Sequence, residues 1–333
     1  MRTLCGLALC GALVIGCGSS VEEAVIEGEA KSSTHTVEFP AITVQPGAEN
    51  TQCVVKRLGN DEIIRVHQIH NVLPTGSHHL IVYRTADTEE KTTPYDCVPF
   101  VDALDPSKGS TVMVTQKHDE TLTLPEGVAF TMPAGQMVRL EMHYINTTAE
   151  EIQVSAKSTF ITIPAKDYKD EADFLFIGTP DIDIAAHSKS TLGPTFFGLP
   201  DDLLNVKFFG ITGHTHQWGT DVTVAAAESA DGPDKSVYDV PGWLWSEPAT
   251  VMHNPPFTIS QGGGFRFTCQ YNNLSDQHVG FGESATDEMC FFWAYYYPSQ
   301  GSYVCVHTKQ IGGGYDLCCP GNSLCSFFNQ FGN

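Results

Sequence analysis

Two short segments of the sequence combine imidazole and thioether side chains at a spacing that suits a metal ion. They are Gly213-His214-Thr215-His216 and Asp287-Glu288-Met289-Cys290. Successive side chains of an extended strand point to opposite faces, so His214 and His216 are expected on one face. A thioether is a soft, uncharged ligand that favours Cu(I) over zinc, magnesium or calcium. Two imidazoles and Met289 therefore predict a copper site with an open position for an exogenous molecule.

Two further segments place histidines in strand-like contexts. His78 and His79 lie within Gly76–Tyr83, and His143 lies within Leu140–Tyr144. Neighbouring side chains of a regular strand face opposite ways, so His78 and His79 can bind one ion only where the backbone is bulged or twisted. Taken singly, these histidines are more typical of structural residues. The metal hypothesis depends on their occurring together.

The positions of these residues depend on β-strands. Between the chain ends the sequence is a series of short alternating apolar segments broken by Gly, Pro, Asn and Asp, such as Glu62–Val66 and Val138–Met142. A chain of 333 residues is longer than one sandwich usually holds. We therefore expect an all-β protein with two domains, residues 34–165 and 166–310, and Ile161–Asp167 suits the link between them.

The N-terminus has the features of an export signal. Met1–Cys17 carries one positive charge and then a short apolar run that is too short for a permanent transmembrane helix. Val14–Cys17 resembles a bacterial lipobox, in which the Cys is acylated and the chain is cut before it. We expect a signal peptide at 1–16, a lipid on Cys17 and a flexible tether at 17–33; an ordinary signal peptide is the alternative. The expected location is the bacterial cell envelope, at the outer membrane.

Cysteine content and charge agree with export. Eight of the 11 cysteines follow Cys17, an even number that suits disulfides in an oxidising compartment. Residues 311–333 form a Cys-rich tail, which we expect to be a disulfide knot because it contains no histidine. The net charge of −21 argues against nucleic acid as a partner.

Together these motifs resemble the copper type II, ascorbate-dependent monooxygenases, the family of peptidylglycine α-hydroxylating monooxygenase and dopamine β-monooxygenase. The shared pieces occur in the family order: His78-His79, His143-Tyr144, His214–His216, and Asp287–Cys290 followed by the aromatic run Phe291–Tyr297. The resemblance covers Gln52 to Thr308. It implies two tandem antiparallel β-sandwich domains, jelly-roll-like, that face each other across a solvent-filled cleft.

The resemblance implies two copper ions, with these ligands: His78, His79 and His143 in the first domain, and His214, His216 and Met289 in the second. O2 would react at the second copper, where Met289, His214 and His216 are the expected catalytic groups. The first copper would supply a further electron, and ascorbate or another reductant would recharge both. Because imidazoles bind metal only when neutral, copper affinity should fall as the pH drops towards 6.

Disulfide pairs are implied as well. They are Cys53 with Cys97 and Cys269 with Cys290. The family partner of Cys305 has no counterpart near residues 185 to 200, so Cys318, Cys319 and Cys325 remain open as its partner.

The residues around the second copper site depart from those of the peptidylglycine enzymes. Those enzymes hold the substrate carboxylate with an Arg two residues before the first His of His-Thr-His, and this position is Thr212. They also use Asn and Tyr at the positions of Phe291 and Trp293. We therefore expect an apolar or aromatic substrate, a small organic molecule or peptide, in a pocket lined by Thr212, Phe291 and Trp293. The alternative is that both aromatics are core residues.

Three functions remain in competition. The first is a lipid-anchored copper monooxygenase that uses O2 and ascorbate to hydroxylate a C–H bond. The second is a copper-binding or electron-transfer lipoprotein without turnover. The third is a surface protein that keeps only the scaffold, and the retention of all six ligands argues against it.

Overall fold

Strand β10 (Ile152–Ile163) shows why this sequence forms sheets. Its buried side chains, from Val154 to Phe160, occur at every second position and alternate with more exposed ones. This period of two is the pattern of a strand with one face on a core. The computed structural model describes residues 32–74, 76–98, 108–309, 313–320 and 325, which all belong to one compact unit, Lys31–Asn333. The predicted signal peptide and Cys17 lie outside the described residues.

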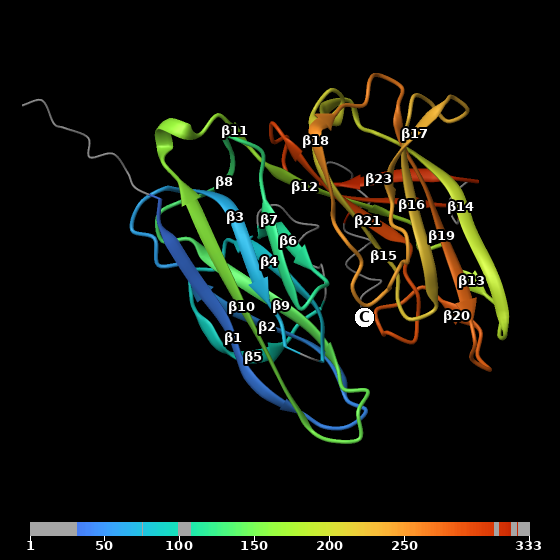
Figure 1. Cartoon of the computed structure of the whole chain (residues 1–333), viewed down its shortest axis with the longest axis horizontal. Coiled ribbons are helices and arrows are strands. Elements are labelled where there is room, and N and C mark those ends of the chain that lie inside the picture. The colour runs from blue at the N-terminus through green and yellow to red at the C-terminus, as the bar shows by residue number, and fades with distance from the viewer. Residues whose placement is uncertain (1–31, 75, 99–107, 310–312, 321–324, 326–333) are drawn as a thin grey trace, which may run out of the picture. The chain divides into compact units, whose positions relative to one another are not determined.

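The first part of the chain forms two sheets (Figure 1). Its strands are β1 (Thr34–Val44), β2 (Glu49–Arg57), β3 (Ile64–Val72), β4 (Ser77–Thr85), β5 (Lys91–Asp96), β6 (Gly109–Thr115), β7 (Asp119–Thr123), β8 (Val128–Met132), β9 (Met137–Ile145) and β10. One sheet has the order β1-β10-β3-β8-β11, with β7 also paired to β3; its last strand, β11 (Asp170–Glu171), comes from the second part of the chain. The other has the order β5-β2-β9-β4-β6 and carries the first set of histidines.

The second part follows a short connection after β10. Its elements are the 3-10 helix η2 (Ala165–Asp167), β11 (Asp170–Glu171), β12 (Asp173–Gly178), β13 (Asp183–Ile184), β14 (Ser188–Gly198), the 3-10 helix η3 (Asp201–Leu203), β15 (Lys207–His214), β16 (Gly219–Ala227), β17 (Asp234–Asp239), β18 (Val251–Phe257), β19 (Gly264–Asn273), β20 (Val279–Gly280), β21 (Phe291–Tyr297), β22 (Tyr303–Thr308) and β23 (Tyr315–Cys319). The two main sheets are β18-β15-β21-β12-β22-β23 and β14-β19-β16-β17. The expected all-β sandwich class is confirmed.

Strand β21 is buried on both of its faces. Side chains at the odd-numbered positions from Phe291 to Tyr297 belong to a core shared with β4 and β6 of the first part. Side chains at the even-numbered positions from Phe292 to Tyr296 belong to the core of the second part. The hydroxyl of Tyr295 accepts the backbone N–H of Val114 at 3.3 Å. Burial on both faces explains why this strand is an unbroken apolar run, unlike an antiparallel strand with one wet face.

The two parts of the chain are in contact where the resemblance implied a solvent-filled cleft. Among the described residues, packed side chains from β21 and β6 meet at the junction of the two parts. Large aromatic side chains gain about 25 cal/mol for each Å² of apolar surface removed from water, which favours contact over an open gap. The expected division at residue 165 coincides with η2 but stays a prediction.

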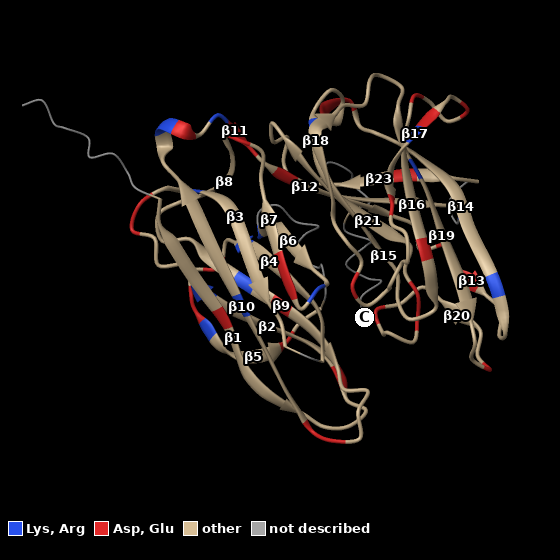
Figure 2. Cartoon of the chain, viewed as in Figure 1, with Lys and Arg blue, Asp and Glu red and all other residues tan. Residues whose placement is uncertain are grey.

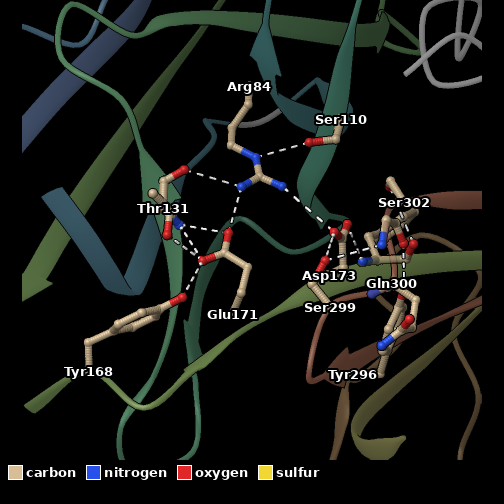
Figure 3. A network of polar contacts seen from close by, with 12 residues as sticks. Arg84, Ser110, Thr131, Tyr168, Glu171, Asp173, Tyr296, Ser299, Gln300 and Ser302 are labelled. Atoms are coloured by element: carbon tan, nitrogen blue, oxygen red, sulfur yellow. Dashed lines mark hydrogen bonds and ion pairs between the residues drawn. The ribbon is translucent and has the colours of Figure 1, made fainter. Parts of the chain in front are cut away.

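A polar network also joins the two parts (Figure 3). The guanidinium of Arg84 on β4 donates to Oε1 of Glu171 at 2.8 Å and lies 3.9 Å from Oδ2 of Asp173. Glu171 also accepts the backbone N–H of Thr131 and the hydroxyl of Tyr168. Arg84 therefore fixes the start of the second part against β8.

The described residues form four disulfides. Cys53–Cys97 and Cys269–Cys290 are the pairs that the resemblance implied. Cys305 pairs with Cys318, and Cys319 pairs with Cys325, so the Cys-rich tail is tied to β22 through β23. These bonds resolve the pairing that the sequence left open.

Acidic residues are distributed along strands and loops of both parts (Figure 2). The sequence contains 39 Asp and Glu residues against 18 Lys and Arg residues. No helix within the described ranges is long and apolar enough to cross a membrane.

Candidate metal centre

Three of the predicted ligands meet on neighbouring strands of the first part. His78 and His79 lie on β4, and His143 lies on β9 as the register partner of His79. The register shifts between Ser77 and His79, which provides the bulge that an adjacent ligand pair requires. One ring nitrogen of each histidine lies within 4.8 Å of the others, and all three residues are buried.

The hydrogen bonds of these rings leave nitrogen atoms available. Nδ1 of His78 lies 3.0 Å from Nδ1 of His79, and Nε2 of His143 lies 2.8 Å from Oε1 of Glu49. Nε2 of His78 and Nε2 of His79 are buried and have no hydrogen-bond partner in the described part of the chain. Buried polar atoms without a partner are rare, and they point to an ion or a water at that position.

The His-Thr-His segment lies at the end of β15. His214 is the last residue of the strand, and His216 lies in the connection to β16. The alternation of side chains between the two faces of a strand, which the sequence predicted for this pair, therefore ends at His214. The ring centroids of His214 and His216 are nevertheless 5.1 Å apart. Nδ1 of His216 is buried without a hydrogen-bond partner among the residues that the structure describes.

Glu288 explains why the backbone leaves the strand after His214. Its carboxylate accepts the backbone N–H groups of His216 at 2.9 Å, Trp218 at 2.6 Å and Met289 at 3.2 Å. Burial raises the pKa of Glu288 to about 7 despite these hydrogen bonds. One side chain thus replaces the ladder partners of the His-Thr-His segment and joins that segment to Met289.

Met289 is buried in the core shared by the two parts, at 4% exposure. Its carbonyl accepts the hydroxyl of Tyr271 at 2.9 Å, and the next residue forms the Cys269–Cys290 disulfide. These contacts hold the backbone of Met289 against β19, and Glu288 connects it to the His-Thr-His segment. Its role as a sulfur ligand stays a prediction.

The two sets of histidines lie in ring contact. The ring centroid of His78 is 6.2 Å from that of His214 and 6.0 Å from that of His216, and His79 is 6.1 Å from His214. In place of the implied solvent-filled cleft, the five predicted imidazole ligands form one buried cluster, none more than 7% exposed.

Burial controls the protonation of this cluster. It lowers the pKa of His78, His79 and His214 well below 6.5, and the neighbouring imidazoles lower it further. Burial also lowers the pKa of His216 to about 4. These four imidazoles are therefore neutral at neutral pH, which is the form that binds metal.

Two residues from opposite parts of the chain close the cluster. The ring of Trp245, in the loop between β17 and β18, stacks on His78 with centroids 5.2 Å apart. Glu49 on β2 binds His143 and also accepts the backbone N–H of Ala285 at 2.8 Å. Burial would raise the pKa of Glu49, but the hydrogen bonds from His143 and Ala285 hold it at about 2. This carboxylate is therefore charged and binds both parts.

The predicted pocket residues have different surroundings. Trp293 faces the cluster, with its ring centroid 6.1 Å from that of His214. Phe291 stacks on Phe176 at 4.8 Å within the core. Thr212 is buried, and its hydroxyl lies 2.8 Å from that of Thr250. The substrate pocket lined by these three residues stays a prediction.

Two spaces lie near the cluster. A void of about 10 Å³, the size of one water, is lined by His79, Val114, Gln116, His214 and Trp293. A cavity of about 210 Å³ lies next to it, since Val114 lines both. Side chains of both parts line the cavity, including Glu120, Thr250 and Tyr295.

Sequence reasoning missed the residues that support the predicted ligands. The sequence placed Glu288 in the Asp-Glu-Met-Cys motif but did not predict its hydrogen bonds to the backbone. Glu49, Gln116 and Trp245 occur in no recognisable motif, because each reaches its histidine from a distant part of the chain.

Comparison with known proteins agrees with the motifs. Residues 197–312 match the family model described as copper type II ascorbate-dependent monooxygenase, C-terminal domain. This match contains His214, His216 and Met289. No curated protein matches the chain.

Similarity to solved structures is low. The major capsid protein P2 from bacteriophage PM2 is 8% identical, with a TM-score of 0.35, over 81% of this chain and 99% of that chain. The Macrobrachium rosenbergii nodavirus structure is 11% identical, with a TM-score of 0.22, over 87% of this chain and 96% of that chain. These TM-scores are too low to support an argument about fold or function.

Proposed function

We propose that the chain hydroxylates a C–H bond of a small organic or peptide substrate, using O2 and ascorbate or another reductant. The match of residues 197–312 to the C-terminal domain of the copper type II ascorbate-dependent monooxygenases supports this proposal. The observation that carries this proposal is the cluster of five buried histidines from both parts of the chain. A structural role alone does not account for three buried ring nitrogens that lack partners among the described residues.

The donor set fits copper. His78, His79 and His143 offer three imidazoles in one place, and the second part offers His214, His216 and the thioether of Met289. Imidazole and thioether donors suit copper, and a thioether favours its reduced state. Copper, when bound, supplies one-electron redox chemistry and reactivity towards O2.

The chain's own residues prepare this chemistry. Burial keeps four of the imidazoles neutral, those of His78, His79, His214 and His216, and excludes water from the cluster. Glu49 and Glu288 hold the ligand-bearing segments through hydrogen bonds to His143 and to the backbone of His216. Partners of this kind fix the orientation of metal ligands.

The surroundings of Thr212 support a substrate other than a peptidylglycine carboxylate. Its hydroxyl is engaged with Thr250, and Thr250 donates to Glu120 at 2.8 Å. A carboxylate thus lies where a substrate carboxylate would need a cation. The neighbouring cavity of about 210 Å³ has room for a small molecule of roughly eight heavy atoms, since a cavity of about 150 Å³ holds the six of benzene.

One observation favours a second function, copper binding or electron transfer without turnover. The histidines of the two sets are in ring contact, and the void at His79, His214 and Trp293 holds only about 10 Å³. This arrangement leaves no room for a substrate between the two sets unless the two parts separate.

One experiment distinguishes these functions. The purified chain, loaded with copper and ascorbate, is incubated with a library of C–H donors under 18O2, and the products are examined by mass spectrometry. We expect two copper ions per chain and one labelled oxygen in the product. Oxidation of ascorbate without product across the library would instead favour the non-catalytic function.

Met289→Ala tests the second copper site. We expect loss of one copper and of product formation, because a Met sulfur is a ligand there. Met252→Ala is the matched control for copper content, since Met252 is 47% exposed and lies on β18. Product formation is left out of this control because Met252 lines the neighbouring cavity. Two retained copper ions in Met289→Ala would contradict the ligand assignment.

We also propose that Cys17 carries a lipid that anchors the chain in the cell envelope. The lipobox-like Val14–Cys17 supports this. In a bacterial host, Cys17→Ala should move the protein from the membrane fraction to the soluble fraction. Equal membrane retention of the variant would rule out this anchor.

A further inference from the structure

Gln116 connects the two parts of the chain at the His-Thr-His segment. It directly follows β6 and is 4% exposed. Its side-chain Nε2 donates to the carbonyl of Gly213 at 3.3 Å, and its Oε1 forms a hydrogen bond with Nδ1 of His214. A residue of the first part therefore binds a predicted ligand of the second, 98 positions away in sequence.

The two contacts of Gln116 determine which ring nitrogen of His214 carries the proton. A backbone carbonyl only accepts hydrogen bonds, so the amide NH2 of Gln116 must face Gly213. The amide oxygen then faces His214, and an oxygen of this kind only accepts. Nδ1 of His214 must be the donor. A neutral imidazole has one N–H, so Nε2 keeps its lone pair.

We propose that Gln116 is a positioning residue for His214, holding the ring with its proton on Nδ1 and presenting Nε2 to a metal ion. The geometry makes this ligand dependent on contact between the two parts of the chain, because Gln116 comes from the first and His214 from the second. The role of Nε2 as a copper ligand rests on the proposed function. The position of the proton does not.

The surroundings of Gly213 keep its carbonyl in place. A Cβ on this glycine would lie 2.7 Å from Cγ1 of Val222 and 2.9 Å from Cε1 of Tyr238, so the backbone packs closely against β16 and β17. The void beside Gln116 and His214 measures only about 10 Å³. Neither group has room to adopt a different pairing.

The segment around Gln116 contacts the second part at further points. Glu120 accepts the hydroxyl of Thr250 at 2.8 Å, and Nε2 of His118 lies 3.5 Å from Oε1 of Glu247. Thr250 and Glu247 belong to the loop that carries Trp245. The connection between β6 and β7 thus holds both His214 and the loop that covers His78.

The tautomer is measured without metal, by 15N NMR of the full chain labelled at histidine and freed of metal by chelation. The signal of His214 is assigned by its loss in His214→Asn. We expect a neutral ring protonated on Nδ1 in the wild type. A wild-type ring protonated on Nε2 would overturn the proposal without any Gln116 variant.

Two variants separate positioning from packing. Gln116→Met keeps length and burial but removes both hydrogen bonds, and we expect a mixture of the two tautomers. Gln116→Glu keeps an acceptor oxygen and should retain the proton on Nδ1. Gln68→Met is the control, because Gln68 bonds Thr123 on the far sheet. An Nδ1 proton retained in full by Gln116→Met would overturn the proposal.

Copper affinity gives a second readout. Competition with a Cu(I) chelator should show that Gln116→Met binds one of two copper ions about 10- to 100-fold more weakly, the usual effect of removing a partner that orients a ligand. Gln116→Glu should restore most of this affinity. Unchanged affinity in Gln116→Met would overturn the positioning role, whereas a wild-type chain that binds no copper would overturn only the proposed function.

Discussion

At the scale of single residues, carboxylates do as much to shape the candidate metal centre as histidines do. Glu288 accepts three backbone N–H groups from two segments, and Glu49 binds His143 together with a loop of the other part. Hydrogen bonds to a charged acceptor such as Glu49 contribute more than neutral ones, about 1.5–3 kcal/mol each. Glu288, with a pKa of about 7, is charged only in part at neutral pH. Both carboxylates fix the backbone or ring of a predicted ligand without being predicted ligands themselves.

Replacing Glu288 should therefore cost both stability and metal. In Glu288→Ala, the N–H groups of His216 and Trp218 lose their acceptor, and a buried unsatisfied donor costs about 1–3 kcal/mol. We expect urea unfolding to show a loss of about 3 kcal/mol, and copper analysis to show one ion rather than two. Glu150→Ala, at an exposed position, is the control. A stable variant that keeps both ions would show that Glu288 is dispensable.

The sequence predicted the histidines but not their supporting residues, and the reason is physical. Ligands are recognisable because metal chemistry restricts the residue types and because His-Thr-His and Asp-Glu-Met-Cys are local. Glu49 contacts His143 from 94 positions away and Gln116 contacts His214 from 98, so their roles arise only from the packing of sheets. The adjacent pair His78-His79 was predictable only on the condition of a bulge, which the register shift after Ser77 supplies.

At the scale of elements, strand β21 and the loop between β17 and β18 decide how the two parts meet. The unbroken apolar run Phe291–Tyr297 predicted a buried strand, but not that its odd positions pack against the first part. The loop carries Trp245 onto His78 and Thr250 onto Glu120. Strand β21 thus contributes to the shared core, and the loop between β17 and β18 covers the histidines.

Trp245 should limit access to the three-histidine site. Removing its ring in Trp245→Ala exposes His78, so a Cu(I) chelator should extract copper from that site several-fold faster than from the wild type. Trp245→Phe keeps an aromatic ring and should behave like the wild type. Trp243→Ala is the control in the same loop, because Trp243 packs on Tyr238 instead. Equal extraction rates in Trp245→Ala and Trp243→Ala would argue against the covering role.

At the scale of the whole molecule, apolar packing and buried charge together hold the two parts in contact. The core that contains β4 and β6 continues into β12 and β21, and the Arg84 network fixes the chain where the second part begins (Figure 3). The side chain of Asp173 is 4% exposed, and burial raises the pKa of its carboxyl. Its charge therefore depends on Arg84. The sequence contains no signal for this contact, since Arg84 and Asp173 are far apart along the chain.

Arg84→Met should destabilise the protein as a whole. It leaves Glu171 and Asp173 without their cation, and removing one partner of a buried pair costs about 3–5 kcal/mol. Because the side chain of Glu171 is 23% exposed, we expect the lower end, about 3 kcal/mol, in urea unfolding. Lys169→Met is the control, since its ion pair with Glu126 is exposed at 62% and 94% and should change stability by less than about 1 kcal/mol. Equal losses in the two variants would contradict this assignment.

The histidine cluster makes the stability of the metal-free protein depend on pH. Burial lowers the folded-state pKa of His78, His79 and His214 well below 6.5, and that of His216 to about 4, whereas the unfolded chain takes up protons near 6.5. The unfolded state thus binds more protons below pH 6.5, so the free energy of unfolding falls as the pH falls from 6.5 towards 4. At pH 5.5 the loss from His216, whose folded-state pKa is about 4, is about 1 kcal/mol, and His78, His79 and His214 add losses in the same direction.

Urea unfolding with a chelator present, at pH 7.5 and pH 5.5, measures this loss. His216→Gln should reduce the difference in unfolding free energy between the two pH values by about 1 kcal/mol, because one proton-binding group is removed from the unfolded state. Burial also affects copper binding, because protons and copper compete for the same imidazoles. Since burial lowers the pKa of these imidazoles below that of free imidazole, we expect the copper affinity to stay unchanged down to pH 6. A free energy of unfolding that is flat or rises as the pH falls from 7.5 to 5.5 would show that water reaches these four imidazoles and that the two parts are apart in solution.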